Sequence, residues 1–183
     1  MQPDHGDARP RVPVGALVML AALLALAPIA FATGGQAQPA PPPAGPPLAR
    51  IAEGAGCRLT EYENGTRTNP PVTGINVERA RFTDGSYAGR RPPGLDASVH
   101  ALLHGRVLFQ YGPDVAADDV AALDRLTRRD PDRVLLFENQ TGMEAPVAAT
   151  AYLSLMTCPR VDDGVLRALD AFRSRRRAFG QSF

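Results

Sequence analysis

The chain has 183 residues and a formal net charge of +1, so no overall charge draws it to nucleic acid or to an acidic surface. Its length corresponds to about one domain. All 20 basic side chains are arginines, and the sequence contains no lysine. This composition excludes a lysine Schiff base and a phosphate-binding loop that depends on Gly-Lys-Ser/Thr.

The uncharged apolar run Val14–Ala32 follows a short tail, residues 1–13, that contains basic side chains. Basic residues on this side predict a cytoplasmic tail and a C-terminal part outside the cytoplasm. The run is long enough to span a bilayer, which favours a single-pass anchor in the cell membrane over residues 14–33. Ala30-Phe31-Ala32 has the small-x-small form of a signal-peptidase site, so secretion after signal cleavage stays the alternative.

Residues 34–49 are rich in proline and alanine. Proline has no backbone donor and the segment has little to bury, so it predicts an extended spacer. The remaining residues, 50–183, are numerous enough to bury one ordinary hydrophobic core. We therefore expect one extracytoplasmic domain beyond the spacer.

The first half of that domain contains two predicted strands separated by a loop. Cys57–Tyr62 predicts a strand that ends before the turn signal Asn64-Gly65. Residues 68–98 are rich in Pro, Gly, Asn and Asp without a clear helical period, which indicates a long ordered loop with short strands. Gly105–Tyr111 predicts the next strand.

The second half begins with a predicted helix from Asp118, as its N-cap, to about Arg129. Val134–Phe137 and Val147–Leu155 then predict two more strands. The resulting order, with one further helix at the end, predicts an α+β fold in which helices pack on one face of a small sheet.

The final helix is predicted to begin at Asp162 or Asp163. Its apolar face, formed by Val165, Leu166, Leu169 and Phe172, is expected to pack on the sheet. The arginine cluster Arg173–Arg177 is expected to remain exposed.

The two cysteines, Cys57 and Cys158, lie near opposite ends of the predicted domain. Outside the cytoplasm an even cysteine count favours a disulfide over two free thiols or a metal role. The bridge would close a loop of about 100 residues, for which chain entropy gives an upper figure of about 4–5 kcal/mol.

His100 and His104 stand four residues apart and therefore share a face in either a helix or a strand. One metal could bridge them across about 6 Å in a helix, but not across about 13 Å in a strand. The loop before them offers the carboxylates Glu78, Asp84 and Asp96. Structural hydrogen bonding, metal or ligand binding and acid–base catalysis are three interpretations of this pair, and we favour a buried, structural His104.

Three ordered motifs resemble a bacterial family, the domain-of-unknown-function family numbered 3105. They are Pro70-Pro71-Val72-Thr73-Gly74, Gly85-Ser86-Tyr87 and the run VHALLHGRV over Val99–Val107. The resemblance covers about Cys57–Phe172 and implies a membrane anchor followed by one extracytoplasmic domain.

The family pattern usually reads Pro-Pro-Thr-Ser-Gly-x-His and His-Ser-Leu-Glu-His-Gly. Asn76 takes the place of the first histidine here, and Leu103 takes the place of the glutamate. The resemblance therefore implies a polar site that has lost two of its groups, with Asn76 as a hydrogen-bond partner of His104.

These features predict a membrane-anchored extracytoplasmic domain that acts as a binding or interaction module of the cell envelope. No serine or threonine has the glycine-flanked elbow or the base of a nucleophile, so no catalytic residue is assigned and a non-enzymatic role is favoured. The predicted polar site contains His100, His104, Asn76 and Tyr87, without a cofactor. The alternative is a metal-dependent hydrolytic or redox site in which His100 and His104 hold zinc or copper. Expected partners are the membrane, through the N-terminal helix, and an envelope protein, but not nucleic acid.

Overall fold

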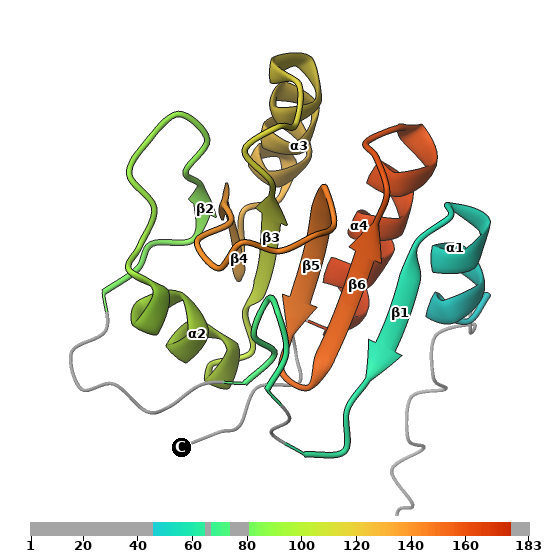
Figure 1. The fold of residues 1–183 in the computed structure, drawn as a ribbon, viewed down its shortest axis with the longest axis horizontal. Coiled ribbons are helices and arrows are strands. Elements are labelled where there is room, and N and C mark those ends of the chain that lie inside the picture. The colour runs from blue at the N-terminus through green and yellow to red at the C-terminus, as the bar shows by residue number, and fades with distance from the viewer. Residues whose placement is uncertain (1–45, 65–66, 74–80, 177–183) are drawn as a thin grey trace, which may run out of the picture. The chain divides into compact units, whose positions relative to one another are not determined.

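A mixed six-stranded sheet organises residues 46–64, 67–73 and 81–176, which are the residues that the computed structural model describes (Figure 1). The elements, in chain order, are α1 (Leu48–Gly54), β1 (Arg58–Glu61), β2 (Gly85–Ser86), α2 (Leu95–Leu103), β3 (Val107–Tyr111), α3 (Ala117–Arg129), β4 (Val134–Glu138), β5 (Val147–Ala151), β6 (Ser154–Cys158) and α4 (Asp163–Arg176). The fold is α+β, as the sequence predicts.

The strands lie in the order β1-β6-β5-β3-β4-β2. The β1–β6, β6–β5 and β5–β3 pairs are antiparallel, whereas β4 pairs in parallel with both β3 and β2. Strands β3, β4 and β5 are buried along almost their whole length and read as continuous apolar runs. Such runs are typical of strands that are covered on both faces.

One face of the sheet carries the main core and is covered by α1, α3 and α4. Alternate residues of β3 point to this face, among them Val107 and Phe109. From α4 the core receives Val165, Leu169 and Phe172, all fully buried, while Leu166 is only partly buried. The predicted packing of the last helix is thus confirmed.

The disulfide between Cys57 and Cys158 joins the edge strand to its neighbour in this core. β1 pairs with β6 so that Arg58 lies opposite Thr157. In this antiparallel register the next pair of opposite residues is Cys57 and Cys158. Their Cα atoms lie 4.3 Å apart, and the predicted bridge is confirmed.

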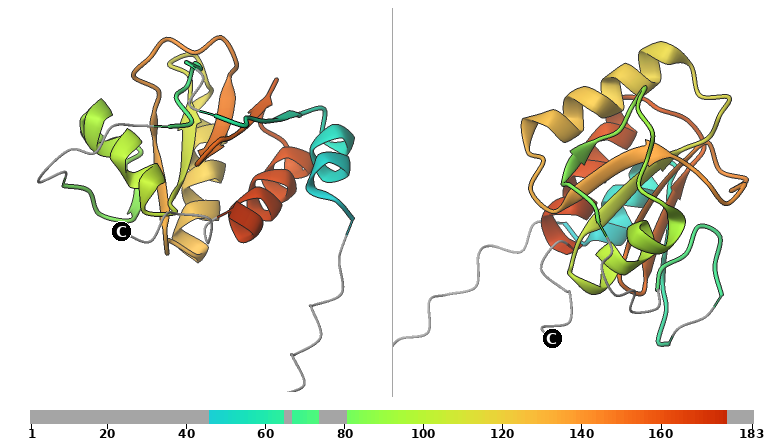
Figure 2. Two further views of the ribbon diagram at one scale, coloured as in Figure 1. Left: turned by 90° about the horizontal axis from the view of Figure 1, so that it is seen from below. Right: turned by 90° about the vertical axis from the view of Figure 1, so that its left-hand side faces the viewer.

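The opposite face is covered partly by α2, so helices occupy both faces rather than one (Figure 2). Ala101 and Leu102 of α2 pack on Leu108, Leu135 and Phe137. The chain moves inward from β2 to β3 through α2 and then outward from β3 to β4 through α3. Both connections join parallel strands, and such crossovers are almost always right-handed. Because the two connections run in opposite directions across the sheet, their helices lie on opposite faces, which explains the position of α2.

A buried polar network occupies this second face beside α2. Gln110 accepts a 2.8 Å hydrogen bond from the Asn139 side chain and lies 3.4 Å from the hydroxyl of Thr150. Asn139 Oδ1 also accepts hydrogen bonds from the backbone N–H groups of Thr141 and Met143. The network ties the loop after β4 to the centre of the sheet.

The two helices that the sequence predicts differ in how they begin. Asp162 Oδ1 accepts a 2.9 Å hydrogen bond from the backbone N–H of Val165 at the start of α4, as predicted. That bond and the Arg160 guanidinium keep the pKa of Asp162 below its ordinary value. Asp118 lies in the first turn of α3 rather than at its cap, because Ala116 is the cap residue and gives no side-chain bond.

Two further predictions are corrected by the structure. Val147–Leu155 is not one strand but the hairpin of β5 and β6, with Leu153 in its turn at φ 58°. The predicted exposure of the arginine cluster is also wrong, because Arg173 is only 4% exposed and Arg175 and Arg176 are half-buried. The Arg173 guanidinium donates to the backbone carbonyls of Leu126 and Asp130. The arginine therefore caps the C-terminal end of α3 from another helix.

Within the described residues, no helix has both the length and the hydropathy that crossing a membrane requires. The predicted anchor, Val14–Ala32, lies outside the described residues.

Candidate functional site

The two histidines of the central motif lie at the C-terminal end of α2, and Gly105 explains why the helix ends there. The N–H of Gly105 bonds to the Leu102 carbonyl, and the N–H of Arg106 bonds to the Ala101 carbonyl. With Gly105 at φ 70°, this pair of bonds is the Schellman motif of a helix C-terminus. Gly105 therefore ends a helix, and the strand that was predicted to begin at Gly105 begins at Val107 instead.

The helix brings the two imidazoles together. His100 Nε2 and His104 Nε2 lie 2.9 Å apart, and the ring centroids lie 4.7 Å apart at an interplanar angle of 69°. One ring nitrogen donates to the other in the metal-free chain, and the tautomers decide which one donates. The spacing of four residues thus acts through a helix, the case in which one ligand can contact both rings.

His104 is exposed, which corrects the expectation of a buried, structural imidazole. His100 is half-buried. Local desolvation lowers the pKa of His104 below 6.5, and the charges of His100 and Arg106 lower it further. His104 therefore presents a neutral imidazole to solvent near neutral pH, and neutral imidazole is the form that binds a metal.

An aromatic ring and an ion pair support the histidines. The Phe82 ring centroid lies 6.4 Å from that of His100 and 6.5 Å from that of His104. The Arg106 guanidinium carbon lies 4.7 Å from the Phe82 centroid, and Arg106 Nε donates a 2.7 Å hydrogen bond to Asp84. The second oxygen of Asp84 accepts the backbone N–H of Arg133, so Asp84 holds the loop to the sheet.

Tyr87 lies in the same loop, and its described contacts are with that loop and with the cluster beneath α2. Its hydroxyl bonds to both the N–H and the carbonyl of Thr83, at 2.9 and 2.8 Å. Its ring packs with Phe82 on the apolar cluster beneath α2. Tyr87 thus fixes the loop that carries Phe82.

Among residues 46–64, 67–73 and 81–176, no three His, Cys, Asp or Glu side chains form a group that could hold a metal ion. Of the three carboxylates considered from the sequence, Asp84 binds Arg106, and Asp96 lies one turn before His100 on the same face of α2. Glu78 and Asn76 lie outside the described residues. The described site is therefore a two-nitrogen site.

The comparison with protein families confirms the family resemblance seen in the sequence. The model of the family described as protein of unknown function (DUF3105) matches residues 60–178, more than half of the chain. The chain belongs to this family. No curated protein and no solved structure matches it.

Proposed function

We propose that this chain is a binding module of the cell envelope whose ligand is a divalent transition metal held by His100 and His104. The observation that carries the proposal is the 2.9 Å separation of the two Nε2 atoms. Imidazole nitrogens bind such metals at about 2.0–2.1 Å. Both Nε2 atoms can therefore contact one ion after the rings adopt the tautomer protonated at Nδ1.

The same separation favours particular metals. Two nitrogens 2.9 Å apart subtend about 90° at an ion that lies about 2.0–2.1 Å from each of them. This angle suits the square-planar or octahedral geometry of Cu²⁺ and Ni²⁺ better than the tetrahedral geometry of Zn²⁺. Because Cu²⁺ also has the highest affinity for nitrogen sites among these divalent ions, we propose Cu²⁺ as the preferred ligand.

The geometry supports binding better than hydrolysis. A metal-dependent hydrolase needs a base that faces the metal-bound water. The Asp84 carboxylate is held by Arg106 and by the Arg133 backbone instead. Two protein nitrogens leave further coordination positions to water or to a second molecule, and this suits reversible capture and release. The predicted anchor would keep the module at the membrane surface.

The proposal is tested by titrating the purified full-length chain with Cu²⁺, Ni²⁺ and Zn²⁺ and measuring affinity and stoichiometry. We expect one Cu²⁺ per chain, and a loss of at least about tenfold in affinity in either His100→Ala or His104→Ala. His5→Ala is the matched control, because His5 is the third histidine of the chain and belongs to the N-terminal tail in the sequence. Equal Cu²⁺ affinity in wild type and in the double variant would refute the proposal.

A further inference from the structure

A cleft that includes Phe82 in its lining lies in the loop before α2. Segments 81–83 and 91–93, together with Tyr87, line a cleft of about 470 Å³. This volume is in the range of small-molecule sites, which is about 300–1,000 Å³. Phe82 lines the cleft and also lies beside both histidines.

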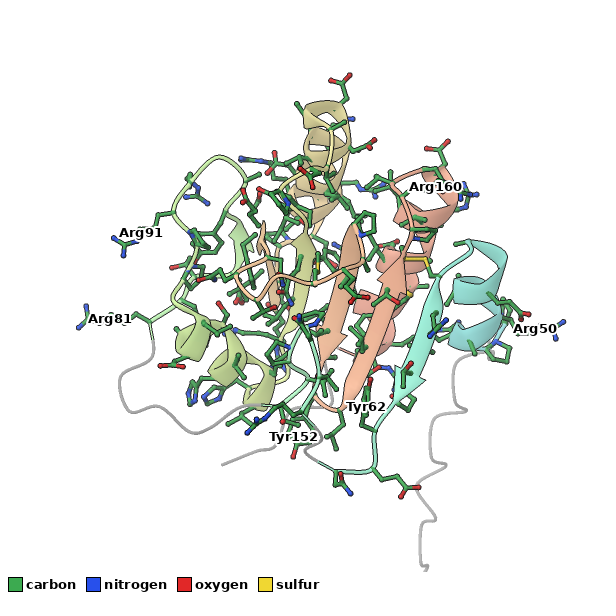
Figure 3. The ribbon with its side chains drawn as sticks, in the orientation of Figure 1. Arg50, Tyr62, Arg81, Arg91, Tyr152 and Arg160 are labelled. Carbon is green, nitrogen blue, oxygen red and sulfur yellow. A yellow bond between two sulfur atoms is a disulfide. The ribbon has the colours of Figure 1, made fainter. Side chains whose placement is uncertain are left out.

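The described lining of the cleft is positively charged, because among the described residues it includes two arginines and no acidic side chain. Arg81 and Arg91 are both exposed, and Figure 3 shows their side chains projecting from the same side of the domain. Among the described residues, neither forms an ion pair or a hydrogen bond.

The neighbouring arginines already have partners. Arg106 pairs with Asp84 and lies over Phe82. The Arg90 guanidinium lies over the Tyr87 ring, donates to the Ser86 carbonyl and interacts with the charge of Asp124. Among the described residues that line the cleft, Arg81 and Arg91 are therefore the charged side chains, and no described carboxylate pairs with either.

The walls of the cleft are fixed by the loop itself. The Tyr87 hydroxyl forms hydrogen bonds with the backbone N–H and the carbonyl of Thr83, and these bonds fix the turn between the two residues. Pro92 and Pro93 form the other wall, and their rings restrict the backbone dihedral angles there. A ligand would meet two guanidinium groups and apolar surface, with little reorganisation of the backbone.

We propose that this cleft binds a small molecule that carries an oxyanion, a carboxylate or a phosphate, through Arg81 and Arg91. The planar guanidinium group matches both kinds of oxyanion in a bidentate arrangement. The site is separate from the histidine pair and contains no metal-binding side chain, so it does not require a bound metal.

The test is calorimetric titration of the full-length chain with citrate and, separately, with inorganic phosphate, in both cases with metal excluded by dialysis against a chelating resin. Saturable binding of either probe, weakened at least about tenfold in the Arg81→Gln/Arg91→Gln variant, is the expected result. Binding of citrate alone would identify carboxylates as the ligand class, and binding of phosphate alone would identify phosphates.

The matched control is Arg50→Gln, an exposed arginine on α1 at the other side of the domain in Figure 3. It should bind the probes as the wild type does. The His100→Ala/His104→Ala variant should also bind them normally, which separates this site from the proposed metal site. No saturable binding of either probe, or equal weakening by Arg50→Gln, would overturn the proposal.

Discussion

Arg173 on α4 donates a 2.8 Å hydrogen bond to the backbone carbonyl oxygen of Asp130, the residue that ends α3. A second bond from the same nitrogen reaches the Leu126 carbonyl, and the guanidinium also pairs with Asp170. The arginine therefore satisfies carbonyl groups that a helix leaves without intrahelical partners. It connects the two long helices of the main core.

Replacing Arg173 should destabilise the domain strongly. Arg173→Ala removes the side chain that donates to the Leu126 and Asp130 carbonyls and empties a buried position, so we expect the free energy of unfolding to fall by about 2–4 kcal/mol. Arg175→Ala, on the same helix but only half-buried, should change it by less than about 1 kcal/mol. Urea unfolding of both variants measures the difference, and equal losses would show that the α3 contact contributes little.

Reducing the disulfide should also destabilise the domain. Cys57 and Cys158 are separated by 101 positions, so the bridge restricts a long loop of the unfolded chain. Chain entropy sets the loss at up to about 4–5 kcal/mol. Urea unfolding with and without a reductant measures it. The Cys57→Ser/Cys158→Ser variant should not respond to the reductant, and an unchanged wild type would contradict the prediction.

The turn between β5 and β6 offers a stabilising substitution. Leu153 has φ 58°, a left-handed conformation that costs an L-residue about 1–2 kcal/mol and costs glycine little. We expect Leu153→Gly to raise the free energy of unfolding by about 0.5–1 kcal/mol, after subtracting the entropy that glycine adds to the unfolded chain. Tyr152→Gly, which relieves no positive φ, should lower it. A destabilised Leu153→Gly would show that its side-chain contacts outweigh the strain.

The lowered pKa of His104 predicts a pH dependence of the metal-free chain. The folded state binds the proton less tightly than the unfolded state, whose pKa is near 6.5. The free energy of unfolding should therefore fall as the pH is lowered through 6.5, and the fall should stop below the folded-state pKa. His104→Gln should reduce this slope, and His5→Gln should not. Denaturation curves from about pH 8 to about pH 5, the range in which histidine titrates, measure this dependence. The same pH dependence of the unfolding free energy in His104→Gln and in the wild type would contradict the prediction.

Much of the fold was predictable because its local signals agree with its packing. Strands β3 and β4 can be recognised from their continuous apolar runs, and α3 from the periodic spacing of its apolar residues. Both signals lie in the local sequence. The hairpin of β5 and β6 was missed, since Tyr152 and Leu153 are not turn-forming residues and the apolar run continues through them. The burial of Arg173 depends on carbonyls more than 40 positions away, which no local pattern reveals.

The site was only partly predictable for a related reason. A spacing of four residues suits both a strand and a helix, so His100 and His104 could not be placed from periodicity. The signal that was overlooked is Gly105 directly after His104, which is typical of a helix C-terminus. The contribution of Phe82 and the cleft beside it depends on how the loop before α2 folds back onto that helix.

The central claim is that His100 and His104 bind one metal ion together. Pulsed electron paramagnetic resonance of the full-length chain with one equivalent of Cu²⁺ counts the imidazoles that the ion binds. We predict two in the wild type and in His5→Ala, one in His100→Ala or His104→Ala, and none in the double variant. An imidazole count that is the same in the wild type and in the double variant would contradict the account.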